Sequence, residues 1–149
     1  ISRCQIVRFP AFSSKQINTI LKEYLDHSKF NRNAKLKLED LINSANGSPG
    51  QLLTNIEIWN GLSDEITNKL DSPIKNSMEI LEISKIISEQ LEIYQQICLV
   101  NLIQIIWWRK TKNINLLKKL ENLKSHLRKK IQPRLAWEIT LLKISMEDL

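Results

Sequence analysis

The chain has 149 residues and contains 22 Leu and 22 Ile, but only two Val, three Gly and four Pro. This length fits one domain or two small ones, and 42% hydrophobic with 26% charged residues excludes wholesale disorder. Few strand formers and few helix breakers disfavour a sheet-rich fold, so the composition predicts an all-α protein with long helices.

The net charge of +6 is unevenly distributed along the chain. Residues 1–50 carry a net +4, residues 51–100 a net −5 and residues 101–149 a net +7. Within the last third, residues 109–134 hold ten basic residues and one acid, Glu121. Such a block can attract phosphate groups or an acidic partner. A lysine-covered solvent face explains it equally well, and the Ile/Lys/Asn bias is also typical of an AT-rich genome.

The residues of a catalytic or metal site are missing from the pattern. Cys4 and Cys98 form no metal motif, His27 and His126 lie far apart, and the three glycines make no phosphate-binding loop. We therefore expect no metal, no cofactor and no self-contained enzyme. Two cysteines without a disulfide framework favour a reduced, cytoplasmic setting. Because the chain opens at Ile1 without an initiator Met or a leader, we expect a fragment of a longer protein.

The first 61 residues carry signals for three short helices. A short extended segment over residues 4–9 precedes an S-x-x-Q capping box at Ser13 and Gln16, which starts the first helix. Asn46-Gly47 is predicted to stop the second. Apolar residues at helical spacing predict one buried face on each: Ile17, Ile20, Leu21, Tyr24 and Leu25, then Leu38, Leu41, Ile42 and Ala45.

The third helix has the clearest start. Ser48 is predicted as its N-cap, Pro49 as its first helical residue and Gln51 as the residue that closes a capping box. Gly61 is expected to end it. The buried side is predicted to contain Leu52, Leu53, Ile56 and Trp59.

Helix breakers nearly vanish after Pro73 until Pro133. Asp71-Ser72-Pro73 is a helix-start signal, and Ser63 is a weaker one. Four helices are predicted, at about 73–87, 89–110, 114–131 and 133–146.

The second of these four helices is apolar on nearly every side between Ile97 and Trp108. These 12 residues, which include Asn101 and Gln104, are too short for a membrane span. A helix without a polar face must be covered all round, either by its own bundle or by neighbouring subunits. The sequence alone does not decide between cover by the chain's own bundle and cover by neighbouring subunits.

The helix predicted over residues 114–131 is amphipathic. Its apolar stripe is predicted to contain Leu116, Leu120, Leu123, Leu127 and Ile131. Most of the basic block then lies on the outer face. Three of its lysines are candidate contacts for DNA or an acidic partner: Lys118, Lys129 and Lys130.

Three segments also resemble a known family in their order and spacing. They are Ser2-Arg3-Cys4-Gln5, residues 45–52 (ANGSPGQL) and residues 132–138 (QPRLAWE), with Leu141-Leu142 beyond. Together they look like the C-terminal portion of the delta-prime subunit of bacterial DNA polymerase III, a clamp loader of the AAA+ family. The resemblance covers essentially the whole chain, and the first segment is specific to clamp loaders as a group.

The resemblance implies a helical lid domain over residues 1–61, with an extended lead-in over 1–12, and a helical-bundle collar domain over 62–149. The family's nucleotide-binding domain would precede Ile1. The implied function is that of a non-hydrolysing subunit that helps to load the sliding clamp onto primed DNA. Its implied partners are the gamma or tau and delta subunits in a hetero-pentamer, with primed DNA and the clamp reached through the assembly. No membrane partner is implied.

The resemblance also implies roles for individual residues. Arg3 resembles a trans arginine finger that reaches the ATP of a neighbouring subunit, where a planar, permanent cation stabilises developing phosphate charge. Hydrolysing sister subunits usually carry an arginine where this chain has Gly50, which favours delta-prime. Five collars forming a ring would explain the all-round apolar helix, so five residues are candidate interface contacts: Leu102, Ile105, Ile106, Trp107 and Trp108.

Two alternatives stay open from the sequence. The first is a helical nucleic-acid-binding module that uses the basic block over residues 109–134. The second, weaker one is an ATP-hydrolysing subunit of the same assembly, which Gly50 argues against.

Overall fold

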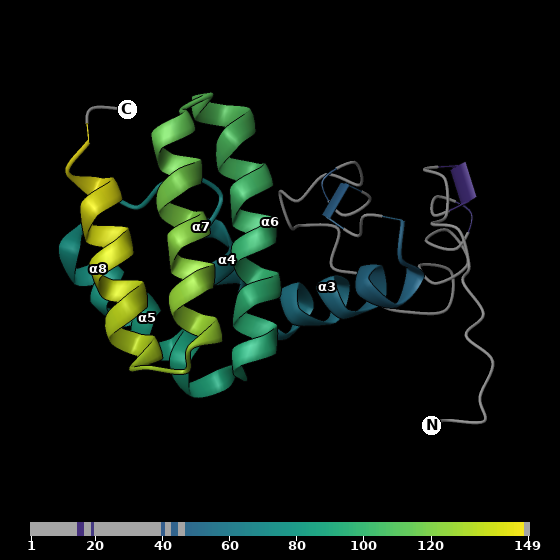
Figure 1. Ribbon diagram of the computed structural model, residues 1–149, viewed down its shortest axis with the longest axis horizontal. Helices are drawn as coiled ribbons and strands as arrows, with labels where there is room; N and C mark the ends of the chain where they lie inside the picture. Colours follow the sequence, from purple (N-terminus) through teal and green to yellow (C-terminus); the bar gives the residue numbers. More distant parts are fainter. Residues whose placement is uncertain (1–14, 17–18, 20–39, 41–42, 45–46, 148–149) are drawn as a thin grey trace, which may run out of the picture.

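The computed structural model describes residues 15–16, 19, 40, 43–44 and 47–147, and these residues are all-α, as the composition predicts. Its helices are α3 (Pro49–Gly61), α4 (Asp64–Lys69), α5 (Ser77–Gln90), α6 (Ile93–Thr111), α7 (Ile114–Arg128) and α8 (Pro133–Ser145) (Figure 1). The predicted lead-in, the capping residue Ser13 and both predicted apolar faces of the first two helices lie outside the described residues. None of the described helices combines the length and hydropathy that a bilayer crossing requires.

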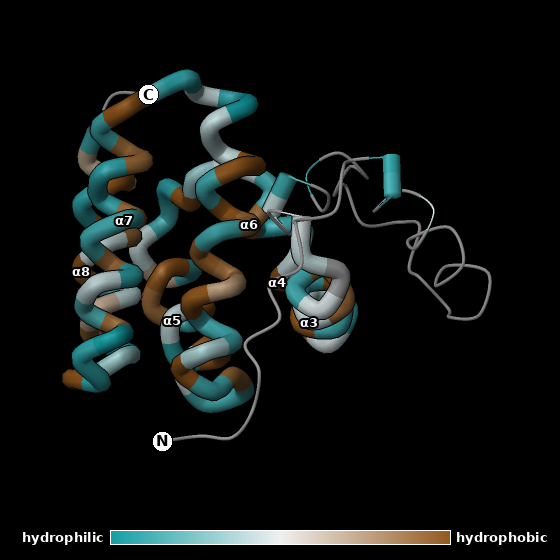
Figure 2. Tube along the Cα trace, turned by 45° about the vertical axis from the view of Figure 1, so that its right-hand side comes forward, coloured by the Kyte–Doolittle hydropathy of each residue, from teal (hydrophilic) through white to brown (hydrophobic). Residues whose placement is uncertain are grey.

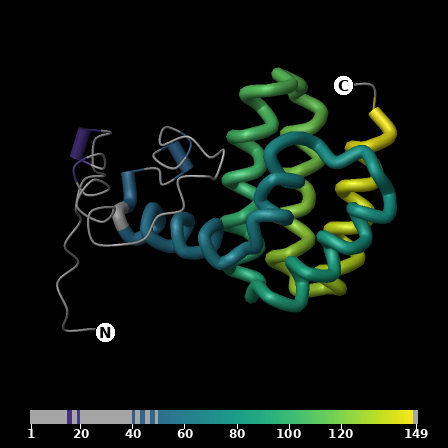
Figure 3. Tube along the Cα trace, turned by 180° about the vertical axis from the view of Figure 1, so that it is seen from behind, coloured from purple at the N-terminus to yellow at the C-terminus, as the bar shows by residue number. Residues whose placement is uncertain are grey.

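Helices α5 to α8 form an antiparallel bundle. Helix α7 lies between α6 and α8, and α5 packs against α8 and contacts α6 behind these three helices in the view of Figure 1 (Figures 1 and 3). Hydrophobic and hydrophilic stretches alternate along these helices in Figure 2, as expected where each helix buries one face. Helix α3 lies outside the bundle and packs against α6. The short connections place the start of α6 and the end of α7 at the same end of the bundle.

One hydrophobic core joins α3 to the bundle. Leu52, Ile56 and Trp59 of α3 are buried in the same cluster as Leu99 of α6 and Leu120 of α7. Leu53, predicted inside, is only half-buried. The predicted lid–collar boundary at residues 61–62 is therefore not marked by a break in the core, and it stays a prediction.

Side-chain caps mark where α3, α4 and α5 begin. The Ser48 hydroxyl accepts a hydrogen bond from the Gln51 N–H at 3.3 Å, which confirms the predicted start of α3. The weak signal at Ser63 is also a real start, since its hydroxyl accepts from the Ile66 N–H at the start of α4. The predicted start at Pro73 is wrong. Helix α5 begins at Ser77 because the Asn76 side chain accepts two backbone N–H groups there.

Helix α7 ends three residues earlier than predicted. It stops at Arg128, and the following connection contains two residues in the left-handed region, Lys130 at φ 56° and Gln132 at φ 41°. These conformations end the helix before Pro133 starts α8. Ile131 therefore does not continue the buried stripe; it is 64% exposed, whereas Leu116, Leu120, Leu123 and Leu127 are buried as predicted.

Gln51 links α3 to α6 instead of closing the predicted capping box. Its Nε2 donates to Asn55 Oδ1 at 2.8 Å and to Cys98 Sγ at 3.1 Å, and its Oε1 accepts from Tyr94 Oη at 3.0 Å. Arg109, near the other end of α6, pairs with the buried Asp40. The segment that precedes the bundle is thus fastened to both ends of α6.

Two buried tryptophans are held by hydrogen bonds. Trp107 Nε1 donates to the Leu70 carbonyl at 2.7 Å, and Trp137 Nε1 donates to Gln96 Oε1 at 2.9 Å. Trp59 is equally buried, but its Nε1 has no acceptor among the described residues. Leaving a buried acceptor without its donor lowers the free energy of unfolding by about 1–3 kcal/mol. Removing the indole of Trp107 or Trp137 would leave such an acceptor, whereas removing that of Trp59 would not.

Replacing Trp107 by Phe is therefore expected to cost more than replacing Trp59 by Phe. Both changes remove similar apolar area, but only Trp107→Phe strands a buried carbonyl, at Leu70. We expect Trp107→Phe to lower the free energy of unfolding by about 1–2 kcal/mol more than Trp59→Phe does. Urea unfolding of both variants measures the difference, and equal losses would contradict the role of the Leu70 bond.

Candidate functional site

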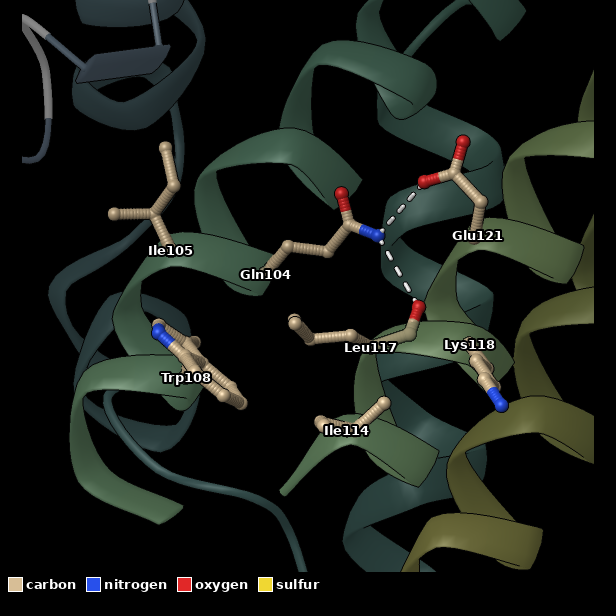
Figure 4. Close-up of a pocket in the computed structure, with 7 residues that line it drawn as sticks. All are labelled: Gln104, Ile105, Trp108, Ile114, Leu117, Lys118 and Glu121. Carbon is tan, nitrogen blue, oxygen red and sulfur yellow. Dashed lines mark hydrogen bonds between the residues drawn. The ribbon is translucent and has the colours of Figure 1, made fainter. Parts of the chain in front are cut away.

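A groove runs between the outward faces of α6 and α7, with a volume of about 470 Å³. The lining residues are Gln104, Ile105 and Trp108 from α6, and Ile114, Leu117, Lys118 and Glu121 from α7 (Figure 4). Each of these α7 positions is three or four residues from two of the others, which places them on one face of the helix. We call this feature the α6–α7 groove.

The walls of the α6–α7 groove are apolar. Ile114 is 60% exposed, and Ile105, Trp108 and Leu117 are half-buried. In Figure 4 the Leu117 and Ile114 side chains face Gln104 and Trp108 across the hollow. Lys112 lies with its Nζ 5.4 Å from the centre of the Trp108 ring, a cation–π contact that orients the indole. The groove thus presents an oriented aromatic beside exposed aliphatic side chains.

A hydrogen-bonded chain fixes the polar edge of the α6–α7 groove. Gln104 Nε2 donates to the Leu117 carbonyl at 3.3 Å and to Glu121 Oε2 at 3.0 Å (Figure 4). Glu121 pairs with Lys124 at 2.7 Å, and Lys124 also donates to Asn101 Oδ1 at 2.8 Å. Lys124 is buried at 8% exposure, although the sequence predicts the basic block mainly on the surface. Its ammonium holds the pKa of Glu121 below its ordinary value, and the Gln104 bond acts in the same direction.

The Glu121–Lys124 pair gives a pH-dependent stability. A carboxyl group whose pKa is lowered by folding stabilises the folded state above the unfolded pKa and loses that effect as the pH falls through the folded pKa. Glu121→Gln is therefore expected to destabilise the protein at pH 7, by less than about 1 kcal/mol because the carboxylate is more than half exposed.

The difference in the free energy of unfolding between the wild type and Glu121→Gln should shrink as the pH falls below 4.5, which is the ordinary pKa of this carboxyl group. Urea unfolding at pH 7 and at successively lower pH measures it. A difference that stays constant with pH would show that charge on Glu121 is not the cause. The chain offers Glu89→Gln on α5 as a control, since Glu89 is exposed and has no ion pair among the described residues.

The predicted interface residues separate into two groups. Leu102, Ile106 and Trp107 are at most 2% exposed and are covered by the chain's own helices. Their burial therefore requires no neighbouring subunit. Ile105 and Trp108 line the α6–α7 groove and keep part of their surface exposed. The interface role stays a prediction, and the structure leaves surface for it only at the second group.

The remaining predicted residues lie apart from one another. Lys118 is exposed on the α6–α7 groove, whereas Lys129 and Lys130 are exposed beyond the other end of α7. Arg3 lies outside the described residues. Gly50 is exposed on the first turn of α3, and a Cβ there would approach only Ser48 Oγ, at 4.0 Å. Packing therefore does not require glycine at this position.

Four groove residues are absent from the site residues that the sequence predicts: Gln104, Ile114, Leu117 and Glu121. The heptad-like stripe through Leu116 and Leu120 was the stronger signal and masked the second apolar edge. The i, i+3 spacing of Ile114 and Leu117 could have revealed this edge, and Glu121 lies one turn after Leu117 on the same face. In the part of the chain that the structure describes, no three His, Cys, Asp or Glu side chains gather as they would around a metal ion.

Comparison with known families identifies the chain. A family model described as "Cyanobacterial DNA polymerase III delta prime, C-terminal domain" matches residues 15–144. The chain belongs to this family. The match confirms the sequence resemblance and includes Gly50 and the segment over residues 132–138, while Arg3 lies before it. No curated protein and no solved structure matches the chain.

The delta-prime subunit is a non-catalytic component of the clamp loader of DNA polymerase III. Family membership therefore assigns the chain to the replication machinery and to a complex with other polymerase subunits. It does not by itself say which surface of the chain makes those contacts.

Proposed function

We propose that this chain serves as the assembly part of a non-hydrolysing clamp-loader subunit, with its bundle as the collar and the α6–α7 groove as a contact for a neighbouring subunit. The gamma or tau and delta subunits are the partners in a hetero-pentameric ring, which loads the sliding clamp onto primed DNA in the cytoplasm. The proposed assembly role of this chain needs no cofactor.

The α6–α7 groove supports the proposal because it combines the features of a protein interface. Aromatic and aliphatic residues in a depression, bordered by fixed polar groups, are typical of interface hot spots. Trp108 is oriented by Lys112, and Gln104 is held by two hydrogen bonds. Little side-chain freedom remains to be lost on binding, which favours affinity.

The groove also lies on rigid elements. Its two walls are α6 and α7, which pack against each other along the bundle. Helix α3, the last helix of the proposed lid domain, is joined to α6 through Gln51. In the proposed ring, the collar would therefore hold the lid of the same subunit in a defined position.

Arg3 is proposed to complete the ATP site of the next subunit in the ring. This rests on the Ser2-Arg3-Cys4 resemblance, and the physical reason is that a guanidinium stabilises charge on the transferred phosphoryl group. Gly50 supplies no cation from the first turn of α3, which fits a subunit that does not hydrolyse ATP itself.

Introducing a charged residue into the α6–α7 groove is expected to weaken assembly. Ile114→Asp and Ile105→Asp place a carboxylate that must be desolvated at the interface. Truncation at an interface hot spot commonly costs 2 kcal/mol or more, so we expect the affinity for partner subunits to fall by about 30-fold or more. Size-exclusion chromatography with light scattering of the reconstituted loader measures it.

The chain offers a matched control for this experiment. Ile131 is 64% exposed, close to the 60% of Ile114, but it lies outside the groove. Ile131→Asp is expected to assemble normally, and thermal unfolding should show that Ile114→Asp stays folded. If folded Ile114→Asp and Ile105→Asp both assemble like the wild type, the groove is not the contact.

Loss of the Arg3 guanidinium is expected to slow ATP hydrolysis by the assembled loader. In Arg3→Ala the neighbour's site lacks its trans cation, and comparable fingers are worth about 10³-fold or more in rate. Arg3→Lys should rescue poorly, since an ammonium lacks the planar fork. DNA-stimulated hydrolysis by the full-length, reconstituted assembly is the measurement. Normal ATP hydrolysis by a normally assembled Arg3→Ala complex would contradict the role of Arg3 as a trans arginine finger.

A further inference from the structure

The basic block over residues 109–134 does not act as one surface, because the fold neutralises half of it. Five of its ten cations form ion pairs: Arg109 with Asp40, Lys110 with Asp71, Lys119 with Glu147, Lys124 with Glu121 and Arg134 with Glu138. Within the described residues, five have no ion pair: Lys112, Lys118, Arg128, Lys129 and Lys130. Three of these five are consecutive, at the end of α7.

A second hollow, of about 520 Å³, opens beside these three cations. It lies where α6 begins and α7 ends, at the opposite end of α7 from Lys118. Its lining residues are Glu92, Ile93, Tyr94 and Ile97 from the start of α6, with Arg128 and Lys130. We call it the Tyr94 hollow.

Tyr94 presents an aromatic face in the Tyr94 hollow. The residue is 59% exposed, so its ring is not part of the core. Its hydroxyl donates to Gln51 Oε1 at 3.0 Å, which anchors the tip of the ring on α3. Ile93 and Ile97 are half-buried beside it on α6. An exposed ring held at one end can serve as a stacking platform at little entropic cost.

The charge in the Tyr94 hollow is positive. Arg128 and Lys130 are both exposed, and Lys129 adjoins them. Glu92 is the one acid among the lining residues, and it is engaged in a reciprocal capping box with Gln95 at the start of α6. Favourable placement near the α7 C-terminus accounts for cations in this turn, but it does not account for an exposed aromatic ring beside them.

We propose that the Tyr94 hollow binds single-stranded nucleic acid, with one base stacked on Tyr94 and with backbone phosphates contacted by Arg128 and Lys130. Stacking on aromatic rings combined with cationic contacts to the backbone is the chemistry by which proteins hold unpaired strands. A duplex keeps its bases stacked inside and offers none to the ring. The site does not depend on ring assembly, so it stands apart from the α6–α7 groove.

Fluorescence anisotropy with a labelled oligothymidylate of about 16 nucleotides tests the site in the intact protein. Tyr94→Ala should weaken binding about fivefold to a hundredfold, since stacking on one ring is lost. Tyr94→Phe keeps the ring but loses its hydrogen bond to Gln51, so it should bind more tightly than Tyr94→Ala and no more tightly than the wild type. Arg128→Gln and Lys130→Gln should each reduce the slope of log affinity against log salt by about 0.7. The charge-matched control is Lys75→Gln, because Lys75 is an exposed lysine at the other end of the bundle. It should change neither the affinity nor the salt dependence.

Four results with nucleic acid would overturn the proposal, and a fifth, competition by polyglutamate, is given below. The four are no salt-dependent binding by the wild type, equal binding by folded Tyr94→Ala, equal loss in Lys75→Gln, and tighter binding of a duplex than of the single strand. Circular dichroism melts confirm that each variant is folded. Displacement of the oligonucleotide by polyglutamate at equal charge concentration would assign the surface to an acidic protein instead. The affinities for oligothymidylate and oligouridylate then show whether the site prefers DNA or RNA.

Discussion

Helix α6 has apolar side chains on nearly every side, and the rest of the structure is arranged to cover it. Cys98, Leu99 and Val100 are at most 2% exposed, although consecutive residues point in different directions around the helix axis. Helix α7 covers one side and α3 another, while Trp107 is tied to the end of α4 through Leu70. The cover is incomplete at Ile105 and Trp108. The α6–α7 groove is the part of this helix that the chain leaves for another molecule.

Much of the fold was predictable because local signals and the tertiary structure agree. Ser48 caps α3 and Pro133 opens α8, and both signals act within a few residues of the chain. The start of α5 was not predictable in this way. Asp71-Ser72-Pro73 is a valid helix start by itself, but Ile74 is buried in the non-helical segment before α5, and Asn76 supplies the cap that the structure uses. The choice between two adequate caps was made by packing.

The candidate site was predictable only in part, for a similar reason. An all-round apolar helix shows that Ile105 and Trp108 must be covered by something, but it cannot distinguish them from Leu102 or Ile106. That distinction depends on where α3 and α7 lie. Likewise, ten basic residues in sequence give no indication that Lys119 and Arg109 pair with acids distant in the chain. Ion pairing over long sequence separations decides which charges remain available to a ligand.

The fastening of α3 to α6 has a mechanical consequence. Only Leu62 and Ser63 separate α3 from α4, and Gln51 and Asn55 bind α3 near its start to α6 and to Ser44. With Arg109 bound to Asp40 farther along α6, the two attachments are separated by much of a helix that is about 28 Å long. Two separated anchor points resist torque, whereas a single one would act as a swivel. Anchors at two separated places on α6 therefore restrict rotation of α3 relative to the bundle more than either anchor would alone.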